Sequence, residues 1–134
     1  MTDKEKFMKH ALRQARKAEK AEEVPIGCVI VKDGKVFTRA YNMRQTKRLA
    51  TAHAEILAIE KACRKIKDWR LDGMEMYVTL EPCAMCAGAI ANSRIYSILF
   101  LTFLLISIAL IIQLIANFTT NQKKCNSRQN FYLK

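Results

Sequence analysis

The first 22 residues contain apolar positions that recur at helical spacing. Lysine and arginine separate these positions, which are Phe7, Met8, Ala11, Leu12 and Ala15. Thr2, followed three residues later by Glu5, has the form of a capping box, a common start of a helix. We therefore predict an amphipathic helix over residues 3–22, which Pro25 ends.

A pair of strands is expected after this helix. Residues 26–31 are apolar almost without interruption, which is typical of a strand that is buried on both faces. Asp33-Gly34 is a strong signal for a two-residue hairpin turn, so residues 35–41 are the predicted returning strand.

The remaining elements alternate between helix and strand. Residues 42–51 are polar and predict a loop, and Thr51 is suited to be the N-cap of a second helix. The apolar face of that helix consists of Ile56, Leu57, Ile59, Ala62, Cys63 and Ile66. A third strand is expected over residues 74–80, a short helix from Pro82 to Asn92-Ser93, and a fourth strand over residues 95–100. This order predicts an α/β fold, a three-layer α/β/α domain with helices on both faces of one sheet.

The net charge of the chain indicates the class of binding partner. The formal net charge is +11, and residues 1–94 hold 19 of the 23 basic residues and all 12 acidic ones, which leaves +7. A basic surface favours polyanions, nucleic acid first and an anionic membrane second. Charge that serves only solubility would explain the same balance.

The five cysteines favour metal binding or catalysis over disulfides. Their number is odd, and the N-terminal stretch is charged and amphipathic, unlike a signal peptide. Reduced thiols are typical of cytoplasmic proteins, where they often ligate metals. We therefore expect a cytoplasmic location.

Two short motifs carry the candidate chemistry, His53-Ala54-Glu55 and Pro82-Cys83-Ala84-Met85-Cys86. Each is weak alone. His53 is an ordinary histidine by itself, Glu55 an acid favoured by a helix dipole, and Cys83 with Cys86 a redox pair or half a structural zinc site. In this order, with each at the start of a helix, they form a specific combination.

The combination predicts a catalytic zinc site. Cys83 and Cys86 are three residues apart at a helix start, so both sulfurs lie on one face, where the helix N-terminus is expected to lower the thiol pKa. One histidine and two thiolates leave tetrahedral zinc an open position, where a water is activated. Glu55 lies two residues from a ligand and is the predicted proton carrier.

At this point the chain resembles the zinc nucleobase deaminases, and within them the bacterial tRNA-specific adenosine deaminases. The resemblance covers residues 3–98. It is carried by Pro25-Ile26-Gly27-Cys28-Val29, Asn42, Thr51-Ala52-His53-Ala54-Glu55 and the run from Thr79 to Ile90. It implies a cytidine-deaminase-like fold, Zn²⁺ bound by His53, Cys83 and Cys86, and Glu55 as the proton shuttle.

The resemblance also implies a substrate and partners. The expected reaction is hydrolysis of adenosine to inosine at the wobble position of tRNA, with the anticodon loop as partner and the enzyme as a homodimer. Asn42 would contact the flipped nucleoside, and the backbone N–H of Ala54 would hold the base. Two alternatives stay open. One is a free cytosine, cytidine or guanine deaminase, and the other is an inactive zinc-binding remnant with a membrane-anchoring tail.

After Phe100 the resemblance ends, so we expect a deaminase domain over residues 1–100, C-terminally incomplete, and a separate tail over residues 101–134. Residues 95–122 contain no charged side chain. A transmembrane helix over residues 95–118, which would make the protein membrane-associated, is one interpretation. The other is an out-of-frame translation, which the excess of Ile, Leu, Phe, Asn and Lys and the absence of acids favour.

Overall fold

The computed structural model describes residues 1–101. Eight elements follow one another along this part of the chain. They are α1 (Asp3–Lys20), β1 (Gly27–Lys32), β2 (Lys35–Tyr41), α2 (Arg44–Lys47), α3 (Ala54–Ile66), β3 (Glu75–Val78), α4 (Ala84–Asn92) and β4 (Ser97–Phe100). The predicted succession is confirmed, with one addition. The short helix α2 lies inside the segment that was predicted to be only a loop.

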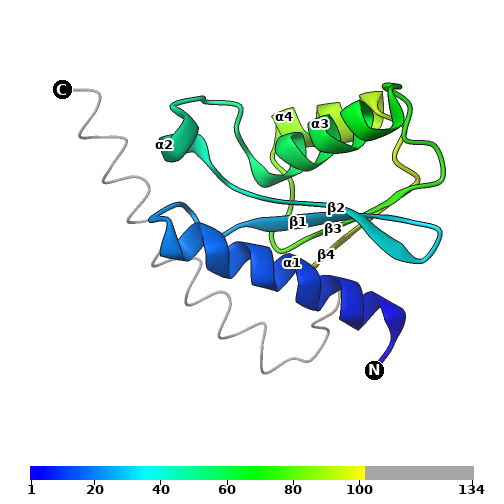
Figure 1. Ribbon diagram of the computed structural model, residues 1–134, viewed down its shortest axis with the longest axis horizontal. Coiled ribbons are helices and arrows are strands. Elements are labelled where there is room, and N and C mark those ends of the chain that lie inside the picture. Colours follow the sequence, from blue (N-terminus) through cyan, green and yellow to red (C-terminus); the bar gives the residue numbers. More distant parts are fainter. Residues whose placement is uncertain (102–134) are drawn as a thin grey trace. The chain divides into compact units, whose positions relative to one another are not determined.

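The four strands form one mixed sheet in the order β2-β1-β3-β4. β1 is antiparallel to β2 and to β3, whereas β3 and β4 are parallel. α1 covers one face of the sheet, and α3 and α4 lie on the other (Figure 1). The expected three-layer α/β/α architecture is therefore confirmed for the described residues.

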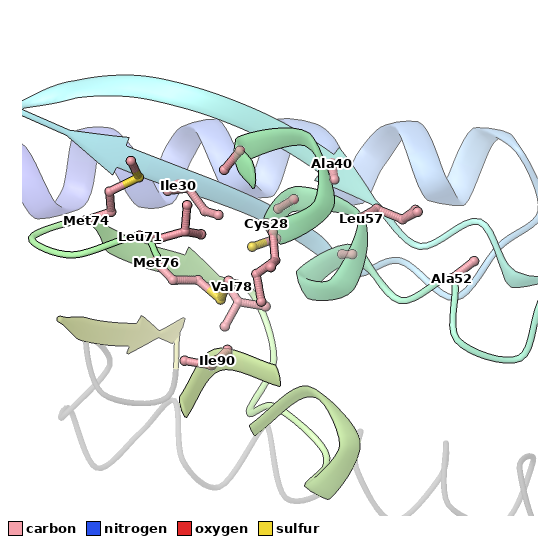
Figure 2. Packing of buried hydrophobic residues seen from close by; sticks show 14 residues of the cluster. Cys28, Ile30, Ala40, Ala52, Leu57, Leu71, Met74, Met76, Val78 and Ile90 are labelled. Carbon is pink, nitrogen blue, oxygen red and sulfur yellow. The ribbon is translucent and has the colours of Figure 1, made fainter. Parts of the chain in front are cut away.

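β1 is apolar throughout because both of its faces are covered. Side chains alternate across a strand, so Cys28 and Ile30 point to the α3 side while Val29 and Val31 point to α1. The larger cluster, on the α3 side, surrounds Cys28 and Ile30 with residues of β3, α3 and α4 (Figure 2). The smaller cluster joins Val29 and Val31 to Phe7 and Met8 of α1 and to Tyr77 of β3.

α1 begins as predicted but ends differently. Glu5 N donates to Thr2 Oγ1 over 3.3 Å and Thr2 N donates to Glu5 Oε2 over 2.8 Å, which is the predicted capping box. The helix ends at Lys20, and Glu22 then adopts a positive φ of 58°. Pro25 therefore does not end the helix. The turn at Glu22 does, because a left-handed residue just past a helix breaks its hydrogen-bond ladder.

The turn between β1 and β2 confirms the predicted hairpin. Asp33 and Gly34 have φ angles of 50° and 70°, as a two-residue turn with left-handed backbone at both positions requires. At the other end of β1, Gly27 lies directly against α1. A Cβ atom there would collide with the backbone of Ala11 and Ala15, so glycine is needed for this close packing.

The apolar run that follows Arg94 begins as a strand. Residues 97–100 form β4 and pair in parallel with β3 from Glu75↔Ser97 to Val78↔Phe100. Among residues 1–101, no helix is long and apolar enough to cross a membrane. Residues 102–118 of the proposed membrane span, like most of the proposed tail, lie outside the described residues.

Candidate metal centre

The fold brings the two sequence motifs together because α3 and α4 lie side by side on one face of the sheet (Figure 1). His53 is the N-cap of α3 and Cys83 is the N-cap of α4. The predicted cap of α3, Thr51, is wrong by two residues: Thr51 O instead accepts from His53 N over 2.7 Å in the preceding turn. The shift leaves His53 itself at the helix start, where its side chain makes no capping hydrogen bond.

The three predicted ligands converge on one point. His53 Nδ1 lies 3.7 Å from Cys83 Sγ and 3.5 Å from Cys86 Sγ, and the ligand atoms all lie within 4.8 Å of one another. Tetrahedral zinc with ordinary bond lengths to nitrogen and sulfur would separate these atoms by about 3.6 Å. The donor set and its spacing therefore fit a zinc ion.

Neither helix start is capped by its own side chain. His53 and Cys83 make no side-chain hydrogen bond to the first-turn N–H groups of α3 and α4. Those side chains are consequently free to bind a metal, and the positive ends of two helix dipoles face the centre. Cys86 is fully buried while Cys83 is exposed, so the centre has one closed side and one side open to solvent.

The expected lowering of the thiol pKa is wrong for Cys86. Burial raises the pKa of the Cys86 thiol well above its ordinary value, and the negative charge of Glu55 and the neighbouring Cys83 raise it further. The helix dipole does not offset this cost. A bound divalent cation reverses it, because a coordinating thiol is deprotonated outright.

Glu55 has the environment expected of a group that meets a ligand. Its exposed fraction is only 3 %, and its Oε2 atom has no hydrogen-bond partner among the described residues. A buried carboxylate oxygen without a partner costs free energy, so such atoms are rare away from sites. The orphaned oxygen beside a His-Cys-Cys triad is a second observation that fits a metal with an activated water.

Asn42 and Ala54 are both buried near the ends of elements that bound the site. Asn42 directly follows β2, and its Nδ2 donates to Val24 O over 3.4 Å while its Oδ1 has no partner among the described residues. Ala54 is the first residue of α3, where a backbone N–H has no acceptor within the helix. Within residues 1–101, no hydrogen bond joins Asn42 to the three metal ligands.

Thr79 is a positioning residue that the sequence reasoning missed. Gly27 N donates to Thr79 Oγ1 over 3.1 Å, and Thr79 N donates to Gly27 O over 3.0 Å. This pair fixes the point where the chain leaves β3 towards Cys83. The sequence analysis placed Thr79 inside a predicted strand and at the start of the run from Thr79 to Ile90, but neither feature indicates this contact with Gly27.

Glu23 was also missed, and it holds α2 in place. Its carboxylate accepts from Thr46 N, Thr46 Oγ1 and Gln45 N over 2.6, 2.9 and 3.2 Å. Burial raises the pKa of Glu23, but these hydrogen bonds lower it more, so the net pKa lies below its ordinary value. The segment between Asn42 and His53 is thereby tied to the turn after α1.

Cys28 is a third buried group beside the centre. It is fully buried in β1, and burial raises the pKa of its thiol, which the charges of Glu55 and Cys86 raise further. Its thiol is therefore neutral and packs as a small apolar side chain. The sequence placed Cys28 in a strand but gave no sign that it would border the metal ligands.

The match to known proteins decides the family. Residues 1–102 match the cytidine and deoxycytidylate deaminase zinc-binding region. The chain belongs to the cytidine and deoxycytidylate deaminase family. Since the matched region is the zinc-binding region of this family, and His53, Cys83 and Cys86 are positioned to hold a metal, the predicted zinc cofactor is confirmed.

Within this deaminase family, several relatives are similar in sequence. The chain is 50 % identical over 103 residues to a tRNA-specific adenosine deaminase of Bacillus subtilis, which covers 77 % of the chain and 64 % of the relative. It is 48 % identical over 97 residues to the tRNA-specific adenosine deaminase of Aquifex aeolicus, covering 72 % and 64 %. The chain thus spans 64 % of the length of both relatives.

Solved structures of deaminases are similar in fold. One, from a study of A-to-I editing by tRNA:A34 deaminases at the wobble position, has a TM-score of 0.72 and 45 % identity, and covers 74 % of this chain and 76 % of that one. A guanine deaminase from Bacillus subtilis has a TM-score of 0.70 and 39 % identity, and covers 72 % and 62 %. The predicted cytidine-deaminase-like fold is confirmed.

Proposed function

We propose that residues 1–100 form the catalytic domain of a zinc-dependent tRNA adenosine deaminase, which hydrolyses adenosine at the wobble position to inosine. One observation carries the proposal: three candidate metal ligands converge beside a buried carboxylate whose Oε2 atom has no hydrogen-bond partner among the described residues. The relatives from Bacillus subtilis and Aquifex aeolicus, both named tRNA-specific adenosine deaminase, support the substrate.

In the proposed reaction, adenosine and water give inosine and ammonia. His53, Cys83 and Cys86 would hold the zinc ion, which would supply an activated water near the ring carbon. Glu55 would carry both protons of that water at Oε2, the first to the ring nitrogen as the C–O bond forms and the second to the amine as the C–N bond breaks. Its burial keeps this carboxylate away from bulk water, beside the candidate metal ligands.

Asn42 and Ala54 are the proposed contacts to the substrate. The unpaired Oδ1 of Asn42 is a hydrogen-bond acceptor that a ribose hydroxyl would satisfy. The N–H of Ala54 points from a helix start and is a donor for an acceptor atom of the base. Both assignments follow the resemblance. Substitution of Asn42 is expected to weaken substrate binding while zinc stays bound.

A free guanine deaminase is the second candidate, because one such enzyme is 39 % identical with a TM-score of 0.70. The basic surface favours RNA, since a free base needs no cations to neutralise phosphates. The non-catalytic, zinc-bound remnant is the third candidate. It predicts stoichiometric zinc with no turnover of any base.

The experiment compares four substrates with one protein. The full chain, with its zinc content measured, is incubated with an anticodon stem-loop RNA carrying adenosine at the wobble position, with free adenosine and cytidine, and with guanine. Inosine in the RNA alone supports the proposal. Product from a free base or nucleoside alone selects the second candidate, and zinc without any product selects the third.

We also propose that the enzyme is a homodimer that associates through α4. Six of its nine residues are exposed and none is charged. The exposed residues of this helix are Ala84, Met85, Ala87, Gly88, Ala91 and Asn92. An uncharged, exposed helix face is typical of an interface. Light scattering would give the mass of a dimer, and Ala87→Arg would reduce it to that of a monomer.

A further inference from the structure

Basic side chains from four elements gather along β2, the edge strand of the sheet. We call this set the cationic edge, and its members are Lys6, Arg13 and Lys17 of α1, Arg39 of β2, Lys47 of α2 and Lys61 of α3. All six are exposed. They come from positions spread over 55 residues of sequence, so only the fold brings them together.

The charges of the cationic edge act on one another. Burial lowers the pKa of His10, and the cations Arg13, Arg39 and Lys6 lower it further. Burial likewise lowers the pKa of Lys61, with Lys47 and Lys17 adding to the effect. Every charged neighbour named here is a cation, so the surface repels itself and would be stabilised by a polyanion.

No intramolecular partner offsets this repulsion among the described residues. The ion pairs found there, Arg64 with Glu60 and Arg70 with Asp68, involve no member of the cationic edge. Solubility charge normally intersperses both signs.

The stripe on α1 extends the same surface along one side of the helix. Lys6, His10, Arg13 and Lys17 follow one another at intervals of four, three and four residues, which places them on one side of a helix. The helix dipole accounts for Lys17, near the C-terminus, but disfavours Lys6, near the N-terminus. The stripe therefore needs another explanation.

The free edge of β2 is closed to another strand. Lys61 Nζ donates to Arg39 O over 2.8 Å, and Lys65 Nζ donates to Phe37 O over 3.2 Å. These two lysines, one helical turn apart, donate to alternate backbone carbonyl groups of β2. An added strand would need the same carbonyl groups as hydrogen-bond acceptors. Each ammonium has three donors, so both lysines keep further donors for an anionic partner.

We propose that the cationic edge binds the phosphodiester backbone of the RNA substrate beside the edited nucleotide. This inference rests on the proposed function and extends it to a surface. The surface is continuous with the site: β2, which carries Arg39, runs directly into Asn42, and α2, which carries Lys47, lies between Asn42 and His53. Phosphate contacts of this kind position RNA without reading its sequence.

The test is the salt dependence of RNA binding. The variant Lys17→Gln/Arg39→Gln/Lys47→Gln is made in the full zinc-loaded chain, and Kd for a tRNA is measured at several salt concentrations. The slope of log Kd against log salt concentration is expected to decrease by about 2–3, because each lost phosphate contact removes about 0.7–0.9. At about 0.1 M salt this corresponds to roughly 100-fold weaker binding. KM for tRNA is expected to rise with kcat unchanged.

A matched control removes the same charge elsewhere. Lys4→Gln/Lys67→Gln/Arg94→Gln changes three exposed basic residues that lie outside the cationic edge, off β2 and outside the ion pairs, and is expected to keep the parent slope within about 1. Equal losses in both triple variants would overturn the inference, as would parent-like binding by the first. So would a parent chain that binds phosphatidylserine vesicles but not tRNA.

Binding is measured by fluorescence anisotropy and does not depend on turnover. If the parent binds tRNA through these residues but makes no inosine, the proposed function fails and the surface assignment stands. If the parent makes inosine and the first triple variant binds tRNA as the parent does, the surface assignment fails and the proposed function stands.

Discussion

Thr79 and Gly27 exchange two hydrogen bonds, one through the threonine hydroxyl at 3.1 Å and one between backbones at 3.0 Å. The pair ties the start of β1 to the end of β3, four residues before Cys83. Since α1 packs directly against Gly27, one glycine links the outer helix, the sheet and the loop that carries a metal ligand.

Replacing Thr79 with valine is expected to weaken both the fold and metal binding. The change keeps the shape of the side chain but leaves Gly27 N without its acceptor, at a cost of about 1–2 kcal/mol. Zinc affinity, measured by competition with a chelating dye, is expected to fall as the loop to Cys83 loosens. Thr79→Ser keeps the hydroxyl and should behave as the parent, and an equal loss in both variants would contradict this account.

Gly27→Ala is expected to destabilise the domain by about 3 kcal/mol in urea denaturation, because the added methyl would collide with backbone atoms that cannot move alone. Gly88→Ala is the matched control. Its Cβ would meet nothing within 4 Å, and alanine in a helix is favoured over glycine by about 1 kcal/mol. Similar effects at both positions would mean that α1 does not pack as closely as described.

Glu55→Gln is expected to abolish turnover while zinc content stays stoichiometric. The amide has nearly the shape of the carboxylate but cannot carry the proton, and loss of a general acid/base lowers kcat by about 100- to 10,000-fold. Zinc is measured by atomic emission and inosine by chromatography of digested RNA. Full activity in this variant, or loss of zinc from it, would show that Glu55 is not the proton carrier.

Glu23 is expected to make stability depend on acid pH. Its folded pKa lies below the ordinary value of 4.5, so the unfolded chain binds the proton more tightly. Its contribution is present above the unfolded pKa and is lost as pH falls through the folded pKa. Glu23→Gln is expected to lower the free energy of unfolding by about 2 kcal/mol near neutral pH. Below the folded pKa of Glu23 the same substitution is expected to change this free energy little. A pH-independent difference in urea denaturation would rule this linkage out.

Much of the fold was predictable because its signals are local. Asp33-Gly34 specifies a hairpin turn by its own backbone preferences, and the uninterrupted apolar run of β1 required cover on both faces. α2 was missed because four residues have no periodicity, and its anchor, Glu23, lies more than 20 residues away. The cap of α3 was misplaced because Thr51 is used in a turn before His53.

The ligands of the candidate site were predictable for a different reason. His53, Cys83 and Cys86 are chemically specific residues at specific spacings, so their identity alone predicts convergence. The raised pKa of Cys86, the position of Cys28 and the cationic edge depend on what packs beside each group. Contacts of this kind follow from the completed fold and have no local pattern.

Only two side chains of α4 are buried, and one of them, Cys86, is a candidate metal ligand. Much of what holds this helix to the domain therefore comes from outside the chain, in the form of an ion. Without the ion, α4 would be held by the packing of two buried side chains alone, and we expect proteases to cleave it before α1, which buries six. The lifetime of the protein would then depend on the metal supply.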